Sequence, residues 1–125
     1  MTVSNLFLDS SIWLSYFFED DDNVREYVER EGLIFTSVLS LYEIKKKLLK
    51  LKIDAEKIKT TIDFIRKNSI LVEINRGICE EASEASFVFG LHAVDSLIYT
   101  SSMKNESTFV TRDFDFKGLK NVVVI

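Results

Sequence analysis

The chain has 125 residues, of which 46% are hydrophobic, so it is long enough to bury the core of one compact domain. Its net charge of −4 argues against a protein that grips nucleic acid by bulk positive charge, although local contacts remain open. The single cysteine, Cys79, excludes an intrachain disulfide, and we expect it to be a core thiol. No apolar run approaches the roughly 20 residues of a membrane-spanning helix. We therefore expect one cytoplasmic domain over residues 1–125, without a membrane segment.

The first half of the chain predicts strands that alternate with helices, because short apolar runs are separated by stretches with apolar residues at helical spacing. Ser10 or Ser11 provides a cap for the first helix, and Thr36 or Ser37 provides one for a later helix. In chain order we expect a strand over 3–8, a short aromatic helix, an acidic loop over 19–22, a polar helix over 23–31 ended by Gly32, a strand over 33–35 and an amphipathic helix over 38–51.

The second half continues the same alternation. The expected elements are a helix capped by Asp54, a strand over 70–72, a helix from Asn75 to Gly90, a helix over 93–103 and strands over 108–111 and 121–125. The chain has no signal for a β-hairpin. Strands alternating with helices therefore predict an α/β fold of three layers, α/β/α, with a mostly parallel central sheet of about five strands.

Four acidic residues occupy positions that this fold brings to one edge of the sheet. Asp9 follows the first strand, and Asp113 follows the fourth. Glu43 and Asp95 lie in helices that are otherwise rich in apolar residues. The carboxyl ends of strands are where open α/β sheets bind ligands. A carboxylate among apolar side chains is costly unless it meets a cation, so converging carboxylates indicate a hard divalent metal such as Mg²⁺ or Mn²⁺.

Each acid also has a plain structural interpretation. Asp9 is placed to cap the first helix, and Asp95 is placed as an ordinary acid of a first helical turn, where the helix dipole favours it. Glu43 is spaced to form an ion pair with Lys46 or Lys47. Only the order of all the motifs favours a shared site over these separate roles.

Four motifs occur in sequence order: Asp9-Ser10-Ser11 after a strand, Thr36-Ser37 before a helix with Glu43, Asp95 at the head of an apolar helix, and Thr111-Arg112-Asp113-Phe114-Asp115-Phe116 after a strand. In this order the chain resembles a PIN domain, and more closely the PIN-domain ribonucleases that serve as toxins in VapBC-type toxin–antitoxin pairs. The resemblance covers essentially the whole chain.

The resemblance implies a metal-dependent endoribonuclease whose metal ligands and catalytic residues are Asp9, Glu43, Asp95 and Asp113. It also implies bound Mg²⁺ or Mn²⁺, an RNA substrate, an inhibitory antitoxin and a homodimer. Thr111 and Ser10 would support the site, while Asp115 is open between a fifth acid and a local cap. His92 is expected to cap or pack rather than to bind metal.

The chemistry agrees with these residue types, because phosphodiester hydrolysis needs an activated water and relief of phosphate charge, which a carboxylate-held metal provides. With one histidine, an acid–base pair of histidines is excluded. Three alternatives stay open: a PIN-fold nuclease of RNA maturation or decay without an antitoxin, a PIN module that binds RNA or a partner without cutting, and a receiver-like phosphoryl-transfer domain. The last needs a lysine at a late strand end, where Asp113 stands.

Overall fold

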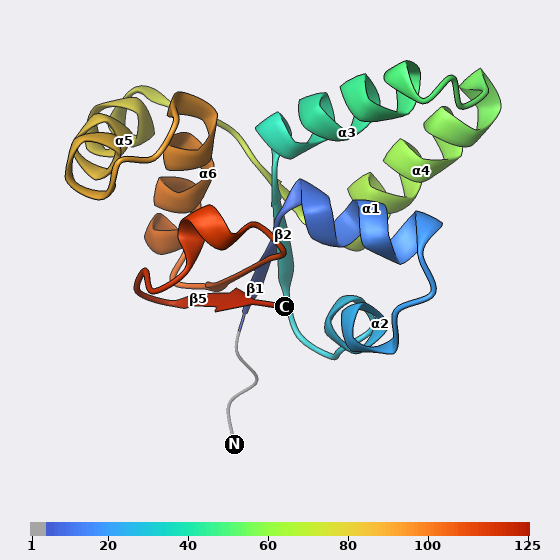
Figure 1. The fold of residues 1–125 in the computed structure, drawn as a ribbon, viewed down its shortest axis with the longest axis horizontal. Helices are drawn as coiled ribbons and strands as arrows, with labels where there is room; N and C mark the ends of the chain where they lie inside the picture. Colours follow the sequence, from blue (N-terminus) through green and yellow to red (C-terminus); the bar gives the residue numbers. More distant parts are fainter. Residues whose placement is uncertain (1–4) are drawn as a thin grey trace.

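The computed structural model describes residues 5–125, so positions 3 and 4 of the first expected strand lie outside the described residues. Figure 1 shows the arrangement of the elements. In chain order they are β1 (Leu6–Leu8), α1 (Ser10–Phe18), α2 (Asp22–Val28), β2 (Ile34–Ser37), α3 (Val38–Lys50), α4 (Ala55–Asn68), β3 (Ile70–Val72), α5 (Arg76–Phe89), α6 (Ala93–Lys104), β4 (Thr108–Thr111), the 3₁₀ turn η1 (Phe114–Phe116) and β5 (Val122–Val124).

The sheet has five strands in the order β3-β2-β1-β4-β5, and every neighbouring pair is parallel. Strand β1 lies at the centre, with Leu6 paired to Ile34 of β2 and to Thr108 of β4. The chain therefore leaves β1 toward one side of the sheet and later returns on the other. The crevice beyond the carboxyl ends of β1 and β4 is a switch point, where parallel sheets of this kind bind ligands.

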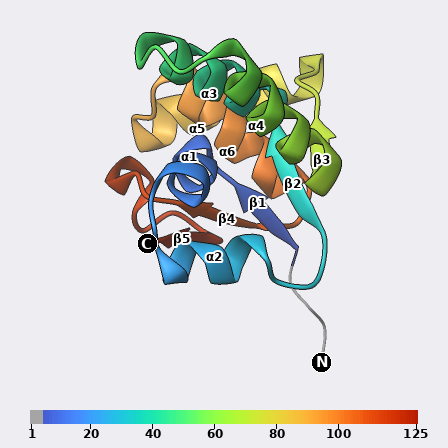
Figure 2. The same ribbon diagram turned by 90° about the vertical axis from the view of Figure 1, so that its right-hand side faces the viewer.

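The two faces of the sheet carry separate apolar clusters, because successive side chains of a strand point to opposite sides. Leu6 and Leu8 pack on the side that helices α1 to α4 cover, whereas Phe7 packs against Phe109 and the Ile98 side chain of α6. Helix α5 lies against α6 on that second side (Figures 1 and 2). The expected three-layer α/β/α fold with a parallel sheet is thus confirmed.

Several helix boundaries are where the sequence predicts them. Asp54 caps α4 by accepting a hydrogen bond from the Lys57 amide at 2.9 Å, and Asn75 caps α5 through the Ile78 amide, also at 2.9 Å. Helix α5 ends at Gly90, whose φ of 70° lies in the left-handed region that glycine adopts without strain.

The structure selects one of the caps expected for the first helix and moves the bounds of the second. Asp9 caps α1, as one interpretation of its position predicts, whereas Ser10 and Ser11 do not, since the Asp9 side chain accepts from the Ser10 amide. Helix α2 spans Asp22–Val28 instead of 23–31, because Asp21 caps it and the chain leaves the helix at Glu29, ahead of Gly32. Short acidic runs offer several competing caps, and only the folded backbone selects one.

Cys79 is exposed on α5, so the expectation of a core thiol was wrong. The inward side of α5 is occupied by Ile78 and Ala82, four residues apart, and Cys79 is turned away from it. None of the helices within residues 5–125 combines the length and the apolar character that crossing a membrane requires.

Candidate metal centre

Asp9 lies where β1 ends, and only 7% of it is exposed to solvent. One carboxylate oxygen, Oδ1, accepts from the Ser10 amide at 2.8 Å. The other, Oδ2, accepts from the Thr111 hydroxyl at 2.6 Å and the Ser11 hydroxyl at 3.1 Å. Burial raises the pKa of Asp9, while the bonds from Thr111, Ser10 and Ser11 act in the opposite direction. Asp9 therefore caps α1, and the same buried carboxylate lies at the crevice.

Thr111 joins the ends of the two central strands β1 and β4. Its hydroxyl donates to Asp9 and accepts from the Asp113 amide at 3.0 Å. Ser11 adds a second link, since its hydroxyl accepts from the Arg112 amide at 3.0 Å. The proposed supporting role of Thr111 thus has a geometric basis, and Ser11 provides a second hydroxyl that bonds across the strands. The Ser10 side chain acts instead on Glu43, and its hydrogen bonding lowers the pKa of that carboxyl.

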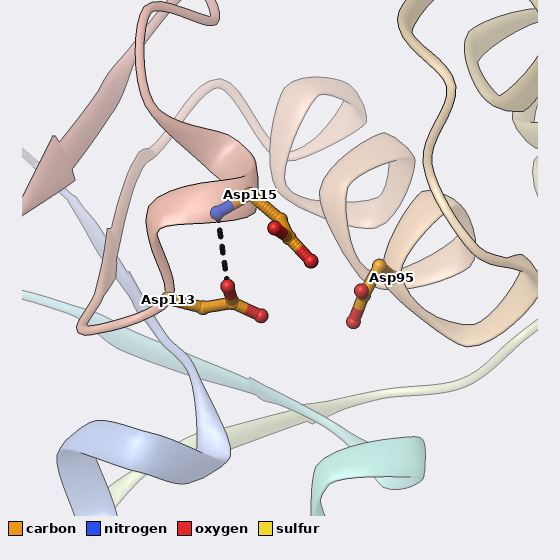
Figure 3. A group of neighbouring side chains, drawn as sticks. All are labelled: Asp95, Asp113 and Asp115. Carbon is orange, nitrogen blue, oxygen red and sulfur yellow. Dashed lines mark hydrogen bonds between the residues drawn. The ribbon is translucent and has the colours of Figure 1, made fainter.

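Asp95, Asp113 and Asp115 form the closest group of acids at this edge (Figure 3). Each offers one carboxylate oxygen, and these oxygens lie within 4.8 Å of one another. Asp113 also caps η1 by accepting from the Asp115 amide at 2.9 Å. Opposite oxygen ligands of Mg²⁺ are about 4 Å apart, so small side-chain rotations would close the group around one cation.

The sequence allows Asp115 to be either a site acid or a cap for the turn before Gly118. The cap of this turn is Asp113, whereas the Asp115 carboxylate faces Asp95 (Figure 3). The position of Asp115 in the group depends on the 3₁₀ turn of η1, which the sequence does not specify.

Glu43 faces the same crevice from α3. Its Oε1 atom is buried and has no hydrogen-bond partner among residues 5–125, and no ion pair joins it to Lys46 or Lys47 there. Burial raises the pKa of Glu43 to about 7, and the negative charge of Asp9 adds to this effect. A buried oxygen without a partner beside other carboxylates fits a site that takes a cation.

Asp95 shows the same crowding of negative charge. Its pKa is raised to about 6, first by burial and then by the charges of Asp113, Asp9 and Asp115. His92 acts in the opposite direction. It is exposed at the N-cap position of α6 and makes no capping hydrogen bond through its side chain, so the expected role in capping or packing was wrong. All four acids expected from the sequence therefore influence one another, although only two of them belong to the closest group.

Arg112 is held within the protein rather than free for RNA. Its guanidinium forms ion pairs with Asp21 at 2.8 Å and Glu19 at 3.4 Å and donates to the Ser15 hydroxyl. These contacts tie the end of β4 to the loop between α1 and α2. They make Arg112 a structural link beside the acidic crevice.

A large groove lies away from the acids, between α3 and α4. It has a volume of about 780 Å³ and a mainly apolar floor. Its lining includes Leu41, Leu49, Ile53, Ile58, Ile62 and the lysines Lys45, Lys46 and Lys59. The groove is therefore a separate surface from the candidate metal centre.

The protein is a three-layer α/β/α domain whose parallel sheet carries several carboxylates at its switch point, and this acidic crevice is suited to a divalent cation. Comparison with protein-family models identifies the family, since the PIN domain model matches residues 6–122. The chain belongs to the PIN domain family. The family suggested by the sequence motifs is thereby confirmed.

Solved structures of toxins and toxin–antitoxin complexes share this fold. A toxin–antitoxin complex from Klebsiella pneumoniae is 16% identical, with a TM-score of 0.80 over 95% of this chain and 96% of that chain. VapBC2 from Rickettsia felis, bound to a promoter DNA fragment, is 18% identical, with a TM-score of 0.75 over 97% of both chains. VapC20 of Mycobacterium tuberculosis, a toxin that cleaves the sarcin–ricin loop, is 16% identical, with a TM-score of 0.72 over 94% of this chain and 98% of that chain. No curated protein matches the chain.

Proposed function

We propose that the protein is a metal-dependent endoribonuclease and the toxin of a toxin–antitoxin pair. The observation that carries the proposal is the crowding of Asp9, Glu43, Asp95 and Asp113 at the switch point of a PIN domain, with Asp115 beside them. Burial first, and then mutual repulsion, raise the pKa of Glu43 and Asp95, and the crevice has the charge and the oxygen atoms that a divalent cation needs.

The acidic residues of this crevice have different roles in the proposed site. Asp95, Asp113 and Asp115 would hold Mg²⁺ or Mn²⁺, and the Oε1 atom of Glu43 would complete the set from α3. The Thr111 hydroxyl holds the Asp9 carboxylate in place, and Asp9 would help to position the other acids at this edge of the sheet. When bound, the cation supplies activation of water and neutralisation of the phosphate charge.

A cleavage assay on single-stranded RNA tests this proposal. We expect cleavage with Mg²⁺ or Mn²⁺, no cleavage in EDTA and none with Asp95→Asn, while Glu84→Gln on the exposed side of α5 stays active. Because activated water attacks the phosphorus, products carry 5′-phosphate and 3′-hydroxyl ends. Cleavage should also survive 2′-O-methylation beside the scissile bond. A 2′,3′-cyclic phosphate formed in EDTA, with equal activity in Asp95→Asn, would overturn the proposal.

The proposed antitoxin partner is supported by the structures of toxin–antitoxin complexes that share the fold. The groove between α3 and α4 suits such a partner, because an apolar floor lies beside Lys45, Lys46 and Lys59. We expect an amphipathic helix with acidic flanks to bind there. If a short reading frame beside this gene encodes such a protein, co-expression should inhibit cleavage, and Leu49→Asp should relieve the inhibition without changing cleavage itself.

A homodimer is also part of the proposal. Sedimentation of the purified chain tests it directly, since a mass of one chain at micromolar concentration would exclude a stable dimer. If no antitoxin is encoded nearby and the cleavage assay succeeds, the protein is instead a PIN-fold nuclease of RNA maturation or decay.

A further inference from the structure

Phe114 stands between two acids of the candidate metal centre, yet its side chain is 72% exposed. It follows Asp113 and precedes Asp115, so its Cα lies about 3.8 Å from the Cα atom of each. A single exposed apolar side chain is common on protein surfaces and needs no special role. Phe114 differs in its place in the chain, because the residues before and after it carry two of the carboxylates of the crevice where a phosphate would be cleaved.

The backbone around Phe114 is anchored on both sides. Phe116 is 1% exposed and packs edge-on against Phe109, with ring centroids 4.9 Å apart. Before it, Asp113 accepts from the Asp115 amide, and after it the Lys117 amide donates to the Phe114 carbonyl at 3.0 Å. The turn therefore fixes the backbone that carries the exposed Phe114 ring. A phenylalanine side chain on a fixed backbone has few torsions left to order when it binds a ligand, so little conformational entropy is lost.

A positive charge accompanies this ring. The Lys117 ammonium lies 5.9 Å from the centroid of the Phe114 ring, within the range of a cation–π contact. An aromatic face with a nearby ammonium matches the two parts of a nucleotide, which are a flat base and an anionic phosphate. Single-stranded nucleic acids are bound in this way, by bases stacked on aromatic side chains and phosphates met by cations.

We propose that Phe114 is a substrate-binding residue on which an unpaired base beside the scissile phosphate stacks, with the Lys117 ammonium contacting a neighbouring phosphate. The proposal rests on the proposed RNA substrate. Stacking accepts any base, because every base has a π-face, but it requires a base that is free of its duplex neighbours. The ring would thus select unpaired nucleotides rather than a particular sequence.

The test measures binding rather than cleavage, using short single-stranded RNAs that carry 2-aminopurine at successive positions. Binding is followed in EDTA on the Asp95→Asn background, where we expect no cleavage. With Phe114 present, 2-aminopurine at one position should be quenched by stacking. Phe114→Ala should abolish this quenching and weaken binding about tenfold, which corresponds to about 1.4 kcal/mol.

Matched variants separate stacking from simple loss of apolar surface. Phe114→Leu keeps apolar area without the ring and should behave as Phe114→Ala, whereas Phe114→Trp should retain both quenching and affinity. Leu33→Ala removes an exposed apolar side chain before β2 and should leave binding unchanged. On fully paired RNA, the difference in affinity between the protein that retains Phe114 and the Phe114→Ala variant should vanish. Unchanged melting temperatures would confirm that the variants fold.

The outcomes also separate this inference from the proposed nuclease. If the wild-type protein never cleaves RNA but quenching still depends on the Phe114 ring, the nuclease proposal fails and the stacking proposal stands. If the protein cleaves RNA and Phe114→Leu binds and quenches like the wild type, the stacking proposal is overturned. The same holds if only binding of a protein partner responds to Phe114→Ala.

Discussion

Asp95 shows how a functional residue can lower the stability of the fold that carries it. Its carboxylate is partly buried and lies near three other acids, which raises its pKa to about 6. Without a cation this crowding costs stability. We expect Asp95→Asn to abolish cleavage while the melting temperature in EDTA stays equal or rises. Glu84→Gln, which removes an exposed charge from α5, serves as the control. A marked fall in the melting temperature of Asp95→Asn would favour a purely structural role.

Glu43 should make the stability of the metal-free protein depend on pH. Its pKa is raised from 4.5 to about 7 in the folded state, so the folded protein binds more protons than the unfolded chain between these values. Stability must then fall as the pH rises through this range. In EDTA, we expect a melting temperature that decreases from pH 4.5 to 7, and a shallower decrease in Glu43→Gln. An equal slope in both proteins would contradict the buried position of this carboxylate.

The carboxyl ends of strands β1 and β4 are linked at the crevice by one hydroxyl group, that of Thr111. Thr111 is fully buried, donates to Asp9 and accepts from the Asp113 amide. Thr111→Val keeps the shape but removes both bonds, so we expect it to lower the free energy of unfolding by about 1–3 kcal/mol and to reduce cleavage. Thr111→Ser retains the hydroxyl and should largely restore both. Denaturant unfolding and the cleavage assay provide the measurements, and a neutral Thr111→Val would refute this role.

The same elements show what a sequence can specify at the site. Asp9 and Asp113 are predictable because each follows a buried strand, and carboxyl ends of parallel strands share one edge. The structure adds that Asp9 is both a helix cap and a carboxylate of the crevice, two roles that the sequence presents as alternatives. The contribution of Asp115 depends on the turn of η1, and the bonds that Ser11 makes to Asp9 and Arg112 depend on side-chain direction. Neither is set by local sequence preference.

The alternation of strands and helices along the chain predicts a three-layer fold with a parallel sheet, because parallel strands need crossover helices. The strand order β3-β2-β1-β4-β5 does not follow from that alternation, since it depends on which way each crossover packs. This order is what puts β1 and β4 side by side and so brings Asp9 to Thr111, which are far apart in sequence. The single-domain organisation of residues 1–125 stays a prediction.

Cation binding should stabilise the whole protein, since a ligand that binds only the folded state raises the free energy of unfolding. Mg²⁺ or Mn²⁺ should raise the melting temperature of the wild type but not of Asp95→Asn. The rise should be larger at pH 8 than at pH 5.5, because Glu43 and Asp95, with pKa values of about 7 and about 6, hold protons at the lower pH that a cation must displace. Calorimetric titration in buffers of different ionisation enthalpy should therefore detect proton release on binding, greater at pH 5.5 than at pH 8. A metal-induced stabilisation that is independent of pH would mean that the cation binds away from these two carboxylates.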